Sequence, residues 1–135
     1  MKKIILLSSA LLIFACSSDD DSEDIPLPAY TIEGKWVWSP SENRADNNTM
    51  YEFVDGVRYT YYCIDCPGDD DYWNSLDESD RIPGGNPYTY ENDTLRVDLH
   101  FGNELVTQIT YECDGGKLHM DGVFSHLWRL NSNCQ

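Results

Sequence analysis

Apolar and polar residues alternate with a period of two over most of the chain beyond residue 30. This alternation is typical of β-strands that bury one face. It is clearest where Leu95, Val97, Leu99 and Phe101 alternate with arginine, aspartate and histidine. The alternation predicts eight short strands, within residues 32–38, 51–53, 57–63, 88–90, 95–101, 105–111, 118–120 and 124–130.

Short turn sequences separate the predicted strands. Asp55-Gly56, Asn92-Asp93, Gly102-Asn103, Asp114-Gly115-Gly116 and Asp121-Gly122 contain the residues that tolerate a positive φ in tight hairpins. Hairpins in series form an antiparallel meander, and closing it leaves no exposed edge strand. We therefore predict an all-β fold, a small eight-stranded antiparallel up-and-down barrel.

Bulky aromatic side chains dominate the predicted interior. The residues expected to point inward are Trp36, Trp38, Tyr51, Phe53, Tyr59, Tyr61, Tyr88, Tyr90, Phe101, Tyr111, Phe124, His126 and Trp128. A barrel of this size is filled by side chains or holds one small ligand. We predict filling around Trp36, Phe53 and Trp128, and a shallow pocket under the open end. The predicted pocket residues are Trp38, Tyr61, Tyr88 and Phe101. The hydroxyl groups of the two tyrosines suit a small polar or sugar-like ligand.

The first thirty residues carry targeting features. Lys2 and Lys3 precede an apolar run that ends at Cys16 and is too short to cross a bilayer. Ile13-Phe14-Ala15-Cys16 resembles the lipobox of bacterial lipoproteins, in which the cysteine is lipidated. An ordinary secretory signal is the alternative. We predict a signal peptide over residues 1–15, a lipidated tether over 16–29 and one domain over 30–135.

An acidic cluster follows Cys16. The sequence Ser17-Ser18-Asp19-Asp20-Asp21 resembles the export signal of Bacteroidota surface lipoproteins. That resemblance implies an outer-membrane protein, held by palmitate and other acyl chains and exposed on the cell surface. Retention at the periplasmic face is the alternative, in which the acids are a solvated spacer.

Gly34-Lys35-Trp36 on the first predicted strand resembles the G-x-W signature of lipocalins. Arg129 on the last strand resembles the arginine that packs across that tryptophan, a cation–π contact that neighbouring strands allow. Residues 30–132 are similar to the short lipocalin-like domains of Bacteroidota lipoproteins. The resemblance implies a barrel that binds small molecules, although the chain is shorter than full-length lipocalins and shows no C-terminal helix.

The charge of the chain excludes one class of partner. The formal net charge is −15, and removing Lys2 and Lys3 with the signal peptide makes it more negative. Such a surface repels phosphate backbones, so we exclude nucleic acid as a partner. The expected partners are the membrane, through the lipid anchor, and a small ligand or a protein.

The cysteines beyond Cys16 predict disulfides. Four is an even number, and the predicted compartment is oxidising. The topology places Cys113 beside Cys134 at the closed end and Cys63 beside Cys66 at the open end. A four-cysteine zinc site would need all four together, and it is the less favoured alternative.

Other candidate chemistry is sparse. Residues 69–80 are rich in carboxylates and form either a calcium loop or, as we favour, a solvated acidic loop. We find no nucleophile–base pair and expect no enzyme, cofactor or metal. The predicted function is a binding or interaction module on a surface lipoprotein. The alternative is a structural envelope protein with a filled barrel and no ligand.

Overall fold

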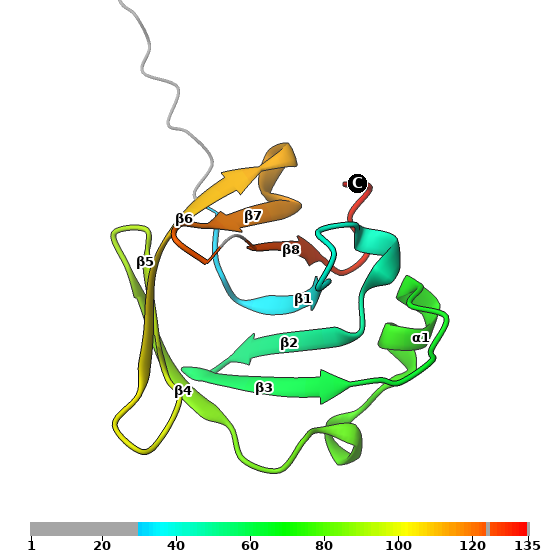
Figure 1. Cartoon of the computed structure of the whole chain (residues 1–135), viewed down its shortest axis with the longest axis horizontal. Coiled ribbons are helices and arrows are strands. Elements are labelled where there is room, and N and C mark those ends of the chain that lie inside the picture. Colours follow the sequence, from blue (N-terminus) through cyan, green and yellow to red (C-terminus); the bar gives the residue numbers. More distant parts are fainter. Residues whose placement is uncertain (1–29, 124, 135) are drawn as a thin grey trace, which may run out of the picture.

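Eight antiparallel strands close into one up-and-down barrel, as the alternation predicts (Figure 1). The computed structural model describes residues 30–123 and 125–134. The predicted signal peptide, Cys16 and the tether therefore lie outside the described residues. The strands are β1 (Gly34–Trp38), β2 (Thr49–Val54), β3 (Val57–Tyr62), β4 (Asn86–Glu91), β5 (Thr94–Asp98), β6 (Glu104–Glu112), β7 (Lys117–Met120) and β8 (Ser125–Arg129).

The first and last strands close the barrel. Trp36 on β1 pairs with Arg129 on β8, and Val37 pairs with Trp128. The β3–β4 contact is the shortest ladder, with only two residue pairs, Val57↔Pro87 and Arg58↔Asn86. Every strand thus has two partners, but β3 and β4 are joined only by this short ladder, which we call the β3–β4 seam.

One apolar cluster fills the inside of the barrel. Its residues come from β1, β2 and β5 to β8 and from the segment before β1, and they are Ile32, Trp36, Phe53, Leu95, Val97, Ile109, Leu118, Met120 and Leu127. Trp36 is fully buried and Phe53 is 2% exposed. The predicted inward faces of β1, β2 and β5 to β7 are confirmed over these residues.

A second apolar cluster, the outer cluster, covers part of the outside of the barrel. Its residues are Val37, Met50, Tyr61, Cys63, Trp73, Trp128, Leu130 and Cys134. Trp73 belongs to α1 (Asp70–Ser75), which lies beside the ends of β2 and β3 (Figure 1). Three 3-10 helices, η1 (Arg44–Asp46), η2 (Glu78–Asp80) and η3 (Cys113–Gly115), complete the connections.

Two strands present the opposite face from the one predicted. Tyr61 and Trp128 pack in the outer cluster, Tyr59 lies under Arg81 on the outside, and His126 pairs with the outer His119. The prediction placed all four inside and was wrong. On β3 and β8 the alternation did identify a buried face. That face lies on the outside of the barrel, where residues 63–85 and the C-terminal segment cover it.

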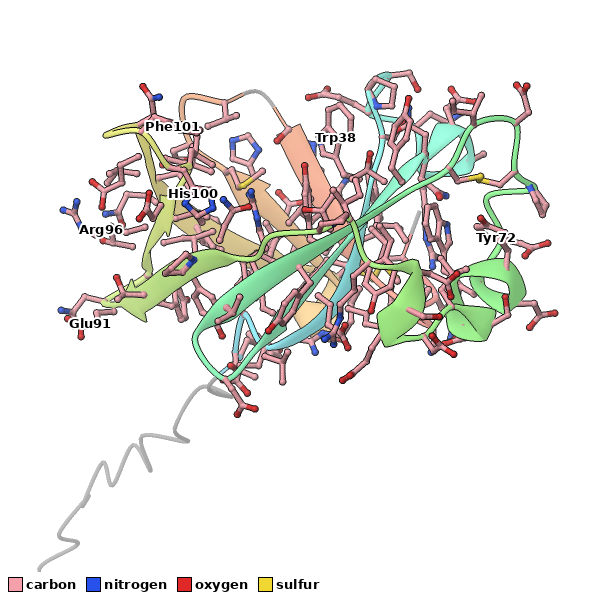
Figure 2. The ribbon with its side chains drawn as sticks, turned by 90° about the horizontal axis from the view of Figure 1, so that it is seen from below. Trp38, Tyr72, Glu91, Arg96, His100 and Phe101 are labelled. Atoms are coloured by element: carbon pink, nitrogen blue, oxygen red, sulfur yellow. A yellow bond between two sulfur atoms is a disulfide. The ribbon has the colours of Figure 1, made fainter. Side chains whose placement is uncertain are left out.

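The predicted strand over residues 95–101 stops at Asp98. His100 and Phe101 have φ values of 66° and 56°, which no extended strand allows. Phe101 is fully exposed at the β5–β6 turn, at the edge of the molecule (Figure 2). The inward position predicted for Phe101 was therefore wrong, and Phe124 lies outside the described residues.

Both predicted disulfides are present. Cys63 is bonded to Cys66 with their Cα atoms 5.8 Å apart. Cys113 is bonded to Cys134 with their Cα atoms 6.2 Å apart. The second bond ties the C-terminal segment to η3, which forms the β6–β7 connection.

Candidate functional site

The barrel interior contains a cavity of about 180 Å³. Its lining residues come from seven strands and one turn, and they are Trp38, Tyr51, Phe53, Arg58, Leu95, Leu105, Met120, Val123, Ser125 and Leu127. Val123 belongs to the β7–β8 connection, Ser125 begins β8, and Trp38 ends β1 (Figure 2). The cavity therefore lies under the end of the barrel that was predicted to be open.

Arg58 is the only charged residue in this lining. It sits at the narrow β3–β4 seam, where its Nη2 donates to Asn86 Oδ1 at 2.9 Å. Its Cζ lies 4.8 Å from the centroid of the Tyr51 ring, a cation–π contact. Its Nε is buried without a hydrogen-bond partner, and no ion pair among the described residues includes it.

Ser125 is a second polar residue in the lining of the cavity. The residue is 6% exposed, and its buried Oγ has no hydrogen-bond partner. A hydroxyl group can both donate and accept. Buried polar atoms normally have partners, so Arg58 Nε and Ser125 Oγ mark the cavity as a site where a further group can bind.

Burial sets the electrostatics of the cavity. Burial lowers the pKa of Arg58, and the electrostatic interaction with Tyr51, which raises this pKa, offsets part of the effect. Burial also raises the pKa of Tyr51, partly offset by the nearby guanidinium. Because arginine remains protonated at any physiological pH, the cavity holds a permanent positive charge.

The predicted pocket residues are only partly brought together. Trp38 lines the cavity. Tyr88 is interior and packs edge-on against Phe53, but its hydroxyl points to Glu33 at 3.4 Å and it lies outside the lining. Tyr61 and Phe101 are not in the interior, so their assignment to the pocket was wrong.

Sequence reasoning missed the polar residues of the cavity. The alternation on β3 assigned Tyr59 and Tyr61 to the inside, which placed Arg58 outside. Ser125 was missed in the same way, because Trp128 and His126 were assigned to the inside of β8. A cation between aromatic residues on a barrel strand was the available signal for Arg58.

The signature residues meet at the other end of the barrel. The Arg129 guanidinium lies 4.4 Å from the Trp36 ring and donates to the carbonyls of Gly115, Glu33 and Thr31. Gly34 has a φ of +117°, and a Cβ there would lie 3.2 Å from Arg129 Nη1. Glycine is therefore required where the strand passes the arginine.

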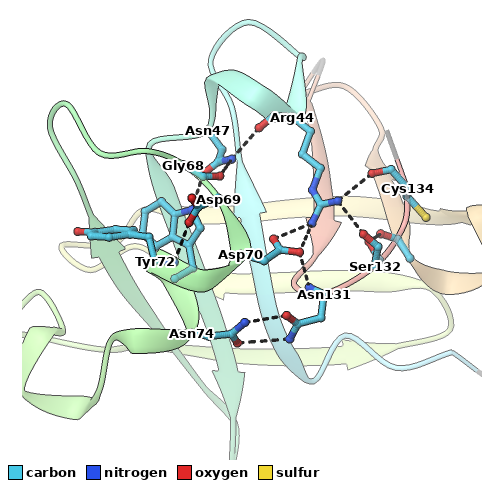
Figure 3. Close-up of polar contacts among 12 residues, drawn as sticks. Arg44, Asn47, Gly68, Asp69, Asp70, Tyr72, Asn74, Asn131, Ser132 and Cys134 are labelled. Atoms are coloured by element: carbon cyan, nitrogen blue, oxygen red, sulfur yellow. Dashed lines mark hydrogen bonds and ion pairs between the residues drawn. The ribbon is translucent and has the colours of Figure 1, made fainter.

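A larger polar groove lies outside the barrel, around Arg44. Arg44 donates twice to Asp70, at 2.8 and 2.9 Å, and also to the carbonyls of Ser132 and Cys134 (Figure 3). Asp70 accepts a further bond from the Asn131 backbone. These contacts join η1, α1 and the C-terminal segment. The charge of Arg44 is compensated by the Asp70 carboxylate within the protein, so we interpret this groove as a structural junction.

The acidic segment 69–80 caps helices. Asp69 accepts from the Tyr72 backbone at the start of α1, and Asp77 and Asp80 form a capping box around η2. Negative charge at a helix start is stabilising. Over residues 30–123 and 125–134, no group of three or more metal-ligating side chains is found.

Comparisons with protein-family models, with curated proteins and with solved structures find no match to this chain. Within the described part of the chain, no helix has the length and apolar character needed to cross a membrane.

Proposed function

We propose that this protein is a lipid-anchored surface lipoprotein whose barrel binds a small molecule in its interior cavity. The observation that carries the proposal is the cavity itself, whose lining residues Arg58 and Ser125 each contain a buried polar atom, Nε and Oγ, without a hydrogen-bond partner. A barrel evolved only for stability would gain by filling that space with side chains, because cavities and unpaired polar groups are destabilising.

The arrangement of the two barrel ends supports this proposal. The ring of Tyr30, the first described residue, packs at a tilt against that of Tyr111, with 5.4 Å between ring centroids, and Gly115 lies beside the Tyr30 ring. The chain thus enters the barrel at the end that contains Trp36 and Arg129. The cavity lies toward the opposite end, beside Val123 and Ser125. A lipid on Cys16 would therefore attach the barrel at the end opposite the cavity.

A cavity-filling substitution tests this function. Leu105 is a half-buried cavity residue, so Leu105→Trp should occupy the space and exclude the ligand. Protein purified from its native host should release a small molecule that mass spectrometry detects, and the variant should release none. Val106→Trp is the matched control, because Val106 is 46% exposed on the outer face. Equal release from both variants, or no bound molecule in the wild type, would contradict the proposal.

A structural envelope protein is the second candidate. The observation in its favour is the packing around Trp36, which is fully buried, together with the small volume of the cavity, about 180 Å³. The same experiment separates the two candidates, because a purely structural barrel carries no ligand.

A further inference from the structure

We propose that the ligand of the cavity is a small organic anion, an apolar monocarboxylate whose carboxylate binds Arg58 and Ser125. This inference rests on the proposed function and names the chemical class of its ligand. Three features of the cavity carry it: an arginine without a counter-ion, two unpartnered polar atoms and an apolar wall.

The first feature is the charge. Arg58 is half-buried. Even partial removal of a cation from water is costly unless an anion compensates it. The partners that the protein supplies to Arg58 are the neutral amide oxygen of Asn86 and the face of the Tyr51 ring. Both attract a cation, but neither neutralises it. The other cavity residues carry no charge, so the missing negative charge is expected to come from the ligand.

Three other arginines of the protein have acceptors for their N–H groups. Arg44 has a bidentate carboxylate and two backbone carbonyls, and Arg81 has the carboxylate of Glu52. Arg129 is stacked on Trp36 and donates to three carbonyls. In Arg58, by contrast, Nε has no acceptor although it is buried.

The second feature is the pair of donors. A guanidinium presents its N–H groups in a planar fork that matches the two oxygens of a carboxylate. Arg58 Nε is free to donate to one oxygen, and the Ser125 hydroxyl can donate to a carboxylate as well. A carboxylate accepts several hydrogen bonds, so either donor is a suitable contact for it.

The third feature is the wall. Apart from Arg58 and Ser125, the lining consists of aromatic and aliphatic residues, among them Trp38, Phe53 and Leu127. An apolar cavity of about 150 Å³ holds one benzene molecule. The cavity of about 180 Å³ has room for a ring of that size together with a carboxylate. A sugar would place several hydroxyl groups against these walls, so an apolar acid fits better.

Benzoate is a suitable probe, with benzyl alcohol as its neutral analogue and acetate as the anion without an apolar body. Binding to the full chain in a non-ionic detergent can be measured by calorimetry. We expect benzoate to bind more tightly than either analogue. Arg58→Met should weaken benzoate binding about 10- to 100-fold, since it removes a charge-assisted hydrogen bond, and should leave benzyl alcohol unaffected.

Two further variants complete the experiment. Arg96→Met is the matched control, because Arg96 is exposed and paired with Glu104, and benzoate binding should not change. Ser125→Ala should weaken benzoate binding and keeps the test valid if Arg58→Met fails to fold.

The outcomes distinguish this inference from the proposed function. If benzyl alcohol binds the wild type as tightly as benzoate, the cavity binds small molecules but the anion inference is wrong. If acetate binds as tightly as benzoate, the apolar part of the inference is wrong. If the wild type binds none of the probes and carries no molecule from its host, the proposed function fails as well.

Discussion

At the scale of single residues, the outer face of β2 and β3 holds an ionic cluster that the sequence does not reveal. Tyr61 Oη donates to Glu52 Oε2 at 2.7 Å, and Arg81 Nη2 donates to the same oxygen at 2.9 Å. Arg81 also lies 3.9 Å from the Tyr59 ring centroid. Burial favours a higher pKa for Glu52, but the hydrogen bonds from Tyr61 and Arg81 outweigh it and lower the pKa.

This cluster predicts a pH-dependent contribution to stability. A carboxylate with a lowered folded-state pKa stabilises the fold above its unfolded pKa and loses that effect as the pH falls through the folded value. Glu52→Gln should therefore reduce the free energy of unfolding by about 1–2 kcal/mol at pH 7, and the difference should shrink below the ordinary pKa of 4.5. Denaturant unfolding at several pH values measures it.

The control for this prediction is Glu104→Gln. Glu104 and Arg96 form a pair in which both side chains are about half exposed, at 51% and 53%. Exposed pairs contribute little, so this variant should match the wild type. A Glu52→Gln variant whose deficit grows on acidification would contradict the assigned sign.

At the scale of secondary-structure elements, α1 depends on the barrel for its existence. It has six residues, far fewer than an isolated helix needs to be stable in water. The Asp69 cap and the packing of Trp73, which is fully buried, hold it in place. The Trp73 indole also donates to Asn47, next to η1. Trp73 thus links the long β3–β4 connection to the outside of the barrel.

Removing Trp73 should disrupt the outer cluster. Trp73→Ala should cost about 3–5 kcal/mol of unfolding free energy, as for other large core truncations. Amide hydrogen exchange should accelerate most in residues 63–76. Tyr62→Ala is the control, because that side chain is 55% exposed, and its effect should stay within about 0.5 kcal/mol. If Trp73→Ala lowers the unfolding free energy by less than about 1 kcal/mol, the outer cluster contributes little to stability.

The elements also show where sequence reasoning succeeds and where it fails. On β5 and β6 the apolar residues lie mainly on one face. The alternation therefore identified both the strand and the face that points into the barrel, as Leu95, Val97 and Ile109 show. On β3 and β8 both faces are covered. Tyr61 and Trp128 are buried by segments far away in the sequence, which a local pattern cannot reveal. The position of Arg58 depended on that choice, so the charge of the cavity was missed.

At the scale of the whole molecule, one end of the barrel is packed and receives the chain, and the other contains the cavity. Trp36, Tyr111 and Arg129 fill the first end, with Tyr111 6.3 Å from Trp36 between ring centroids. Val123 and Ser125 border the cavity at the second end. This polarity is what a module needs if it is held at one end and binds its ligand at the other.

The anchor itself gives a prediction. Cys16→Ala should abolish incorporation of radiolabelled palmitate and move the protein from the membrane fraction to the soluble fraction. Replacing Asp19, Asp20 and Asp21 with alanine should protect the protein from protease added to intact cells, if these acids direct it to the surface. Equal palmitate incorporation by Cys16→Ala would contradict lipidation there, and unchanged proteolysis would make the acids a spacer.

The pairing of β1 with β8 governs when the barrel can form. The Arg129 side chain bonds to the Glu33 carbonyl across 96 residues, and Leu127 pairs with Trp38 on the same ladder. A contact of such long range costs much chain entropy and slows folding. In a growing chain, β1 can pair with β2 early, but its other edge has no partner until nearly the last residues are made. Closure is therefore the final event, and a chain that lacks β8 leaves both β1 and β7 with a bare edge.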